Sequence, residues 1–328
     1  MKFFVIGSNS FSGSSFIHYL LEKGYSVTGV SRSVEEKNIF LKYKSIKSKK
    51  NFSFYRIDIN KNLNSLISLI KQKKPSYIIN FAAQGMVAES WKNPYHWYKT
   101  NLLSQVVFHD ELRKLSFIKK YIQFTTPEVY GSTTKWIKEN NNFAPSTPYA
   151  VSRAACDLHL MSFKKAYDFP VIFTRAANVF GPSQQLYRIV PRTILFSKLN
   201  KQLILDGGGS SIRSFIHIDD VSNALYKIIK NGKVGNTYHI STKETVSIRK
   251  LVKIICDMTN SKFNNFVKIE KDRLGKDQAY LLDSSKLRSE LKWNDKISLE
   301  NGLNDTIRWI ETNFAYIKKL SFDYKHKV

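Results

Sequence analysis

A tyrosine and a cation lie four residues apart in the segment YAVSR, at Tyr149 and Arg153. Thr147 and Pro148 before them are typical of a helix start, and positions i and i+4 share one helical face. A tyrosine, with a pKa of about 10, is a poor base at neutral pH, and a fixed cation beside it lowers that pKa. The spacing indicates a proton-transfer pair; the alternative is a helix that merely begins with a tyrosine.

The turn at residues 7–13, with the sequence GSNSFSG, is a second candidate site. Gly7 and Gly13 keep two places of a Gly-x-x-Gly-x-x-Gly spacing, and Ser10 takes the middle place before Phe11. A dinucleotide turn needs a backbone that approaches pyrophosphate closely and a helix N-terminus aimed at it. The turn follows an apolar run and opens an amphipathic one, which favours a dinucleotide site over a turn without a ligand.

The residues after the second apolar run bear on which dinucleotide would bind. An acidic residue there would bind the adenosine ribose hydroxyls of NAD. This chain has Ser31 and Arg32 instead, and a hydroxyl with a guanidinium suits a 2′-phosphate. We therefore expect NAD(P)+ as cofactor, with NADP slightly favoured over NAD; a surface arginine without a role is the alternative.

Short apolar runs alternate with amphipathic stretches through the first half of the chain, which predicts a parallel sheet covered by helices on both faces. The predicted strands are residues 2–7, 25–31, 52–58, 76–83, 120–126, 170–179 and 236–242. The predicted helices are residues 11–24, 63–72, 96–115, 247–259, 299–314 and one that begins near Pro148.

The fold class that follows is α/β, a doubly wound parallel sheet of the Rossmann type with a smaller C-terminal substrate domain. We assign residues 1–178 to the dinucleotide-binding domain and expect 214–243 to return to it. Residues 179–213 and 244–328, where the pattern loosens into short elements, form the expected sugar-nucleotide-binding domain.

The composition of the chain limits the kinds of partner, metal site and compartment that we expect. The 328 residues carry 52 basic and 26 acidic side chains, a net charge of +26, without helix-turn-helix or zinc-finger spacing. We attribute the charge to solvated lysines and expect no nucleic-acid partner. Two cysteines make neither a disulfide framework nor a metal site, and no apolar run reaches membrane length, so we expect a cytoplasmic protein without metal or membrane insertion.

A series of further motifs carries a family resemblance. They are Asp58-Ile59, NFAAQ at 80–84, Asn101, TTPEVYG at 125–131, TPYAVSR at 147–153, NVFGP at 178–182, RSFIHIDDV at 213–221 and DRLGKD at 272–277. With the glycine-rich turn, they resemble the extended short-chain dehydrogenase/reductase family in its sugar-nucleotide epimerase/dehydratase branch, nearest to dTDP-glucose and GDP-mannose 4,6-dehydratases. The resemblance covers nearly the whole chain.

The resemblance implies a reaction and roles for four residues. A nucleotide-diphospho-hexose would become its 4-keto-6-deoxy form by transient oxidation at C4, loss of water across C5 and C6, and return of hydride to C6. Tyr149 would take the C4-hydroxyl proton, and Thr126 would hydrogen-bond that hydroxyl. Glu128 would remove the C5 proton, and Arg153 stands where the family has a lysine that binds the nicotinamide ribose.

The resemblance also implies binding residues. Gly7, Ser10, Phe11, Gly13, Ser31, Arg32, Asp58, Ile59, Ala82, Ala83 and Asn101 would hold the cofactor with Tyr149 and Arg153, Asp58 and Ile59 contacting the adenine. Gln84, Asn178, Arg188, Arg213, Arg273 and Lys276 would bind the substrate, since a diphosphate suits guanidinium and amide donors. A homodimer through a four-helix bundle is expected.

Two departures from the family pattern leave alternatives open. Pro127 stands where the dTDP-glucose enzymes have an aspartic acid that protonates the departing hydroxyl, although Glu128 is kept as in the GDP-mannose enzymes. Arg153 keeps the charge of the family's lysine but is planar and holds its proton. A 4-epimerase, a 4-reductase or a non-catalytic nucleotide-binding protein is therefore the alternative to a dehydratase.

Overall fold

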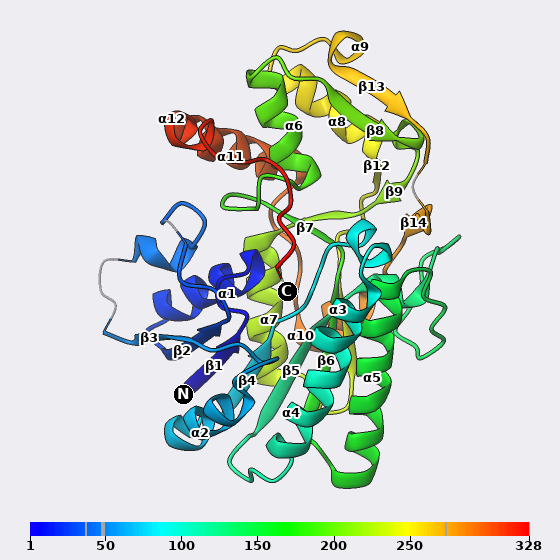
Figure 1. Cartoon of the computed structure of the whole chain (residues 1–328). Coiled ribbons are helices and arrows are strands. Elements are labelled where there is room, and N and C mark those ends of the chain that lie inside the picture. Colours follow the sequence, from blue (N-terminus) through cyan, green and yellow to red (C-terminus); the bar gives the residue numbers. More distant parts are fainter. Residues whose placement is uncertain (37, 47–49, 273, 328) are drawn as a thin grey trace.

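The computed structural model describes residues 1–36, 38–46, 50–272 and 274–327. Seven parallel strands form the central sheet in the order β11-β6-β5-β4-β1-β2-β3 (Figure 1). Their bounds are β1 Lys2–Ile6, β2 Ser26–Ser31, β3 Phe52–Arg56, β4 Tyr77–Asn80, β5 Lys120–Thr125, β6 Val171–Ala176 and β11 Thr237–Ile240. The predicted α/β class is confirmed, and the order reverses beside β1, where doubly wound sheets bind ligands.

Helices cover both faces of the sheet, and successive side chains of a strand point to opposite faces. Phe3 and Val5 of β1 pack with one set of helices, and Phe4 and Ile6 pack with the other. The first set is α1 Phe11–Glu22, α7 Ile218–Asn231 and α10 Ser285–Leu291. The second set is α2 Leu63–Lys73, α4 Ser104–Leu112 and α5 Pro148–Tyr167.

A second hydrophobic core lies beyond the carboxyl ends of the strands, in a region that we call the cap. The cap comprises α6 Ile189–Lys198, β8 Leu203–Asp206, α8 Ile248–Met258, α9 Phe263–Phe266, β13 Val267–Glu270, α11 Leu299–Thr312 and α12 Phe314–Ile317. In Figure 1 it stands above the sheet. The division of the chain into two domains stays a prediction.

Short elements connect the cap to the sheet. Strand β7 Asn178–Phe180 pairs with β10 Phe215–His217, and β9 Ile212–Arg213 pairs with β12 Val246–Ser247 and β14 Ala279–Tyr280. The short helical turns are η1 Lys42–Ser45, η2 Ala88–Trp91, η4 Pro127–Tyr130 and η5 Gly207–Gly209.

The long helix predicted at residues 96–115 is interrupted. The chain forms α3 Pro94–Tyr98, one π-helical turn, η3 Lys99–Leu103, and then α4. A π turn inserts one residue into the helical repeat and is often found at functional sites. Asn101 lies within this turn and is 2% exposed. Apolar periodicity carries no signal for such a turn, which is why the prediction missed it.

Within the described residues, no helix has the length and apolarity that crossing a bilayer requires. Both cysteines, Cys156 and Cys256, are buried free thiols. A search of the same residues for three or more grouped His, Cys, Asp or Glu side chains that could hold a metal ion found no such group.

A fully buried ion pair joins α5 to β6. Arg175 Nη2 donates to Asp157 Oδ2 at 2.9 Å, and neither side chain is exposed. The guanidinium also lies 5.1 Å from the ring centroids of Tyr130 and Phe143. Because arginine keeps its proton in proteins, the pair holds α5 against the sheet only while the Asp157 carboxylate is present.

Asp157→Ala should therefore destabilise the protein by about 3–5 kcal/mol, the usual cost of leaving one member of a buried pair unpaired. Urea unfolding followed by circular dichroism measures the change. Asp110→Asn is the matched control, because Asp110 lies on the exposed face of α4, and its unfolding midpoint should stay near that of the parent. An unchanged midpoint for Asp157→Ala would show that the ion pair does not hold α5.

Candidate active site

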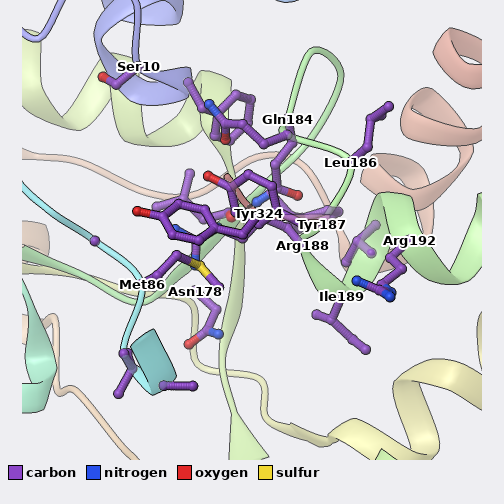
Figure 2. A pocket seen from close by; sticks show the side chains of 18 of the residues that line it. Ser10, Met86, Asn178, Gln184, Leu186, Tyr187, Arg188, Ile189, Arg192 and Tyr324 are labelled. Atoms are coloured by element: carbon purple, nitrogen blue, oxygen red, sulfur yellow. Dashed lines mark hydrogen bonds between the residues drawn. The ribbon is translucent and has the colours of Figure 1, made fainter. Parts of the chain in front are cut away.

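A cleft of about 1330 Å³ separates the carboxyl edge of the sheet from the cap. Figure 2 shows side chains from both sides that line a pocket, with Ser10 at one rim and Arg192 at another. Thirteen of the predicted site residues line the cleft: Ser10, Phe11, Arg32, Ala83, Gln84, Thr126, Glu128, Tyr149, Arg153, Asn178, Arg188, Arg213 and Lys276. The structure therefore brings Tyr149, Arg153, the glycine-rich turn and the predicted substrate residues to one cavity.

The glycine-rich turn packs its backbone directly against the end of β4. Gly7 has φ +81, and a Cβ there would lie 2.8 Å from Ala82 N. A Cβ on Gly13 would lie 2.3 Å from Gly7 O, so both positions require glycine. Ser10 Oγ accepts from Gly13 N at 3.0 Å and donates to Gly7 O at 2.7 Å, which caps α1. The helix N-terminus is thus aimed into the cleft as an anion site requires.

Arg32 lies at the cleft just beyond β2. Its Nη2 donates to Gln84 Oε1 at 3.4 Å, and its Nη1 is buried without a hydrogen-bond partner among the described residues. Ser31 ends β2 and is half-buried. A guanidinium that retains an unused donor here is suited to an anionic group on an adenosine ribose.

Several predicted cofactor residues lie behind the cleft and do not line it. Asp58 Oδ1 accepts from Asn60 N at 2.9 Å, and Ile59 is packed in the core. Ala82 N donates to Asn80 Oδ1 at 3.0 Å. These contacts shape the loops after β3 and β4, and the cofactor roles of these residues stay predictions.

Asn101 connects three elements through its side-chain amide. Its Oδ1 accepts from Gln84 N at 2.8 Å, and its Nδ2 donates to Gln84 O at 3.1 Å and to Ser152 Oγ at 3.0 Å. Ser152 Oγ in turn donates to Tyr149 O at 2.7 Å. Asn101 thus positions the loop after β4 against α5 and reaches the cleft only through Gln84 and Tyr149.

The loop after β5 presents two predicted catalytic groups. Thr126 Oγ1 caps η4 by accepting from Glu128 N at 3.3 Å, and Pro127 is buried at the start of that turn. Proline suits this position because its missing N–H needs no partner there. Glu128 is half-buried and lines the cleft with Thr126 and Tyr149.

Tyr149 and Arg153 lie on consecutive turns of α5, as predicted. The helix is capped by Thr147 Oγ1, which accepts from Ala150 N at 3.1 Å, and Pro148 follows the cap. Arg153 is 4% exposed, donates from Nη2 to Phe124 O, and keeps Nε without a hydrogen-bond partner in the described chain. A surface position for Arg153 is thereby excluded.

The balance of effects on the pKa of Tyr149 differs from the prediction that a nearby cation would lower it. Burial raises the pKa of Tyr149 above its usual value, and Arg153 opposes that shift. Glu128 raises the pKa further, while a hydrogen bond with Thr126 and the charge of Arg188 lower it. The cation acts in the predicted direction, but loss of hydration outweighs it, so the phenol is protonated at neutral pH.

The segments that connect the cap to the sheet contribute polar and basic side chains to the opposite wall. Arg213 donates to Asp277 O and Ile212 O, both at 2.7 Å, and its guanidinium lies 4.1 Å from the Tyr280 ring centroid. Lys276 Nζ lies 2.7 Å from Asp272 Oδ1. Asn178 opens β7, and Arg188 precedes α6 at the cleft (Figure 2). The predicted contact at Arg273 lies outside the described residues.

Sequence reasoning missed several lining residues. Met86, Gln184, Tyr187, Arg192, Tyr280 and Tyr324 all line the cleft. Met86 and Tyr280 lie within two residues and three residues of predicted motifs, which is a usable signal. Tyr187 and Arg192 follow NVFGP in a stretch without periodicity, and Tyr324 follows the last helix with no motif around it.

Comparison with known proteins identifies relatives of the chain. A family model described as GDP-mannose 4,6 dehydratase matches residues 4–306. The human dTDP-D-glucose 4,6-dehydratase is 30% identical over 276 residues, covering 82% of this chain and 78% of that protein. A trifunctional UDP-glucose 4,6-dehydratase/UDP-4-keto-6-deoxy-D-glucose 3,5-epimerase/UDP-4-keto-L-rhamnose-reductase of Arabidopsis thaliana is 31% identical over 267 residues, 80% of this chain. The chain spans 40% of that plant protein's length.

Solved structures share the fold along nearly the whole chain. The dTDP-glucose 4,6-dehydratase of Streptomyces venezuelae, with NAD and TYD bound, has a TM-score of 0.90 at 25% identity, covering 96% of this chain and 98% of that one. A UDP-glucose 4-epimerase of Thermotoga maritima, with UDP-glucose, has a TM-score of 0.86 at 25% identity, covering 96% and 100%.

Arg153→Ala should raise the pKa of Tyr149 further, because it removes the charge that opposes the effect of burial. Arg153→Lys should leave the titration close to that of the parent. Tyrosine ring-carbon NMR measures the pKa, with Tyr149→Phe assigning the signal. If Arg153→Ala titrates like the parent, the cation does not act on this tyrosine.

Proposed function

This chain belongs to the GDP-mannose 4,6 dehydratase family, and on that premise we propose that it is an NAD(P)-dependent 4,6-dehydratase of a nucleotide-diphospho-hexose. The observation that carries the proposal is the convergence of Thr126, Glu128 and Tyr149 on the cleft that the glycine-rich turn enters. A base, a hydroxyl donor and a carboxylate are the groups that oxidation followed by elimination needs.

The residues present fit a dinucleotide. The absence of side chains at Gly7 and Gly13 lets the capped end of α1 approach a pyrophosphate. Arg153 Nε and Arg32 Nη1 are buried donors that have no hydrogen-bond partner among the described residues, and ribose or phosphate oxygens would satisfy them. When bound, NAD(P)+ would supply the hydride acceptor for C4 of the sugar and the hydride donor for C6.

In the oxidation half, Tyr149 takes the C4-hydroxyl proton while Thr126 holds that hydroxyl. Arg153 favours the phenolate, and a cationic nicotinamide ring would add to its effect, which offsets the burial that keeps the phenol protonated. Asn178, Arg188, Arg213 and Lys276, with Arg273, would bind the diphosphate and nucleotide.

In the elimination half, the C4 carbonyl acidifies the C5 proton, which moves to Glu128. The C6 hydroxyl leaves as water and takes a proton. Because Pro127 has no proton to give, we assign this proton to Glu128, so that one carboxylate accepts at C5 and donates at C6. The sugar then receives hydride at C6 and a proton from water at C5, while Tyr149 releases to water the proton that it took from the C4 hydroxyl, which leaves a 4-keto-6-deoxy product.

We further propose that the chain prefers NADP over NAD. This preference rests on Arg32, whose Nη1 has no hydrogen-bond partner within the described residues, and on Ser31 beside it. A 2′-phosphate would give the guanidinium a charge-assisted hydrogen bond, whereas a 2′-hydroxyl would give it a weaker one. The solved relative from Streptomyces contains NAD, so the preference would be a property of this chain.

We further propose that the protein forms a homodimer. Large apolar side chains lie exposed on η3, α4 and α5: Leu103 at 54%, Val107 at 53%, Val151 at 37% and Leu158 at 52%. Two copies of α4 and α5 facing each other would cover them as a four-helix bundle. We place this assembly in the cytoplasm, where the free thiols of Cys156 and Cys256 stay reduced.

A 4-epimerase is the second candidate, favoured by Pro127 and by the structural likeness to the epimerase of Thermotoga maritima. Incubation with a panel of nucleotide-diphospho-hexoses, read by mass spectrometry, separates the two reactions. Loss of one water identifies a dehydratase. Unchanged mass with inverted stereochemistry identifies an epimerase, and no turnover despite tight cofactor binding identifies a non-catalytic protein.

Glu128→Gln should leave C4 oxidation detectable as reduced-cofactor absorbance while slowing loss of water by roughly 10²–10⁴-fold, because the amide cannot carry the proton. Tyr149→Phe should stop both steps. Glu300→Gln, an exposed carboxylate at the start of α11, is the control and should behave like the parent. Normal dehydration by Glu128→Gln would remove Glu128 from the mechanism.

Arg32→Ala should weaken NADP+ binding by roughly 10- to 100-fold, the loss expected for a charge-assisted hydrogen bond, and should change NAD+ binding little. Isothermal titration calorimetry gives both dissociation constants. Arg308→Ala removes an exposed guanidinium on α11 and serves as the control. Equal losses for the two dinucleotides would contradict a role for Arg32 in their discrimination.

Leu158→Asp should convert a dimer into a monomer, because it places a charge at the centre of the proposed bundle. Light scattering coupled to size exclusion gives the mass. Ile269→Asp, on an equally exposed residue of the cap strand β13, should leave the mass unchanged. A parent protein that elutes as a monomer would rule out the bundle.

A further inference from the structure

The last described residues of the chain cross the cleft. We call residues 322–327 the strap. In Figure 1 the chain descends from α12 in the cap and ends between the cap and the sheet. Tyr324, Lys325 and Lys327 line the same cleft as Ser10 and Tyr149, so the strap lies inside the site described above.

On the cap side, the strap is held by aromatic and charged contacts. Phe322 is 9% exposed, and its ring lies 6.1 Å from that of Phe196. Asp323 Oδ1 accepts from Arg192 Nη2 at 3.3 Å. The Tyr324 ring meets the Tyr187 ring edge-on at 5.3 Å (Figure 2).

On the sheet side, the strap bonds to the loops after β2 and β4. Gln84 Nε2 donates to Lys327 O at 2.5 Å, and Tyr324 Oη lies 3.5 Å from Gln84 Oε1. Lys327 Nζ lies 3.3 Å from Ser33 Oγ and 3.7 Å from Glu36 Oε1. These are the carboxyl ends of strands, where a doubly wound sheet binds its dinucleotide.

His326 anchors the strap between two aromatic side chains of α3. Its ring lies 5.0 Å from the buried Trp97, at an interplanar angle of 6°, and 5.0 Å from His96, at 14°. His326 Nε2 and His96 Nδ1 are 2.8 Å apart, so one imidazole donates a hydrogen bond to the other.

These contacts engage both Nε2 and Oε1 of Gln84 and place the strap against the loops after β2 and β4, at the cleft that Arg32 and Ser10 also line. We propose that the strap is an autoinhibitory contact, which must leave Gln84, Ser33 and Trp97 before a dinucleotide enters the cleft. The inference rests on the proposed cofactor site but not on the dehydration chemistry. If only the strap-open form binds, the apparent dissociation constant exceeds the intrinsic one by the reciprocal of the open fraction.

Cofactor binding to the full chain tests the strap. Tyr324→Ala and His326→Ala each remove one anchor, and they should raise the association rate of NAD+ and NADP+ and tighten binding by about 5- to 10-fold, as a larger open fraction requires. Lys319→Ala, at an exposed residue that precedes the strap and does not line the cleft, is the control and should stay within about two-fold of the parent. Stopped-flow tryptophan fluorescence and calorimetry give the rates and constants.

Weaker binding by the anchor variants would overturn the inference, because the strap would then be a lid that closes on a bound cofactor. Binding equal to that of the parent would also overturn it. A protein that binds dinucleotide with the expected dependence on the strap but dehydrates no sugar nucleotide would overturn the proposed function and leave the strap standing.

Acid gives a second test through His326. Burial lowers the pKa of His326, His96 and Arg32 lower it further, and Glu89 raises it. Lys325 and Lys327 flank it on the strap. Since the strapped form favours the neutral imidazole, its stability is lost as the pH falls below about 6.5, the pKa of a free imidazole. Association should quicken over that range in the parent and less in His326→Ala; equal pH profiles would contradict the anchor.

Discussion

The amide of Asn101 is the contact on which the geometry of the cleft depends. It bonds to both backbone groups of Gln84 and to Ser152, which bonds to the carbonyl of Tyr149. A single side chain thus connects the loop after β4 to α5, the helix that carries Tyr149 and Arg153. Asn101 lies in the π turn η3 and is 2% exposed.

Burial and the charge of Arg153 have opposite effects on the pKa of Tyr149. A protein that encloses a phenol in a cleft raises its pKa, and the nearby carboxylate of Glu128 adds to that effect. Arg153, which is buried and keeps its proton, lowers that pKa. Burial and Glu128 outweigh Arg153, so the pKa of Tyr149 stays above its usual value.

The features that the sequence predicted are those with strong local causes. Continuous apolarity identifies strands buried on both faces, Thr147 with Pro148 marks the start of α5, and the glycine spacing marks a turn without room for a Cβ. Parallel strands end at the same edge of the sheet, so motifs that follow these strands can be predicted to meet at the cleft.

The features that it missed depend on contacts between distant segments. The hydrogen bond of Arg32 to Gln84 joins residues 52 positions apart, and that of Gln84 to Lys327 joins residues 243 positions apart. Neither hydrogen bond corresponds to a pattern in the neighbouring sequence. The dominance of burial over charge at Tyr149 also depends on how tightly the cap and the loops enclose the ring, which composition and spacing do not contain.

The position of β11 at the sheet edge has a consequence for biosynthesis. Strand β6 is buried along its whole length, and β11, which covers its outer side, is encoded some sixty residues later, after α6 and the first cap strands. While the ribosome makes the intervening segment, an apolar edge of a nearly complete sheet lies open to pairing with other chains. The nascent protein therefore passes through an aggregation-prone stage whose length is set by how quickly the cap is translated.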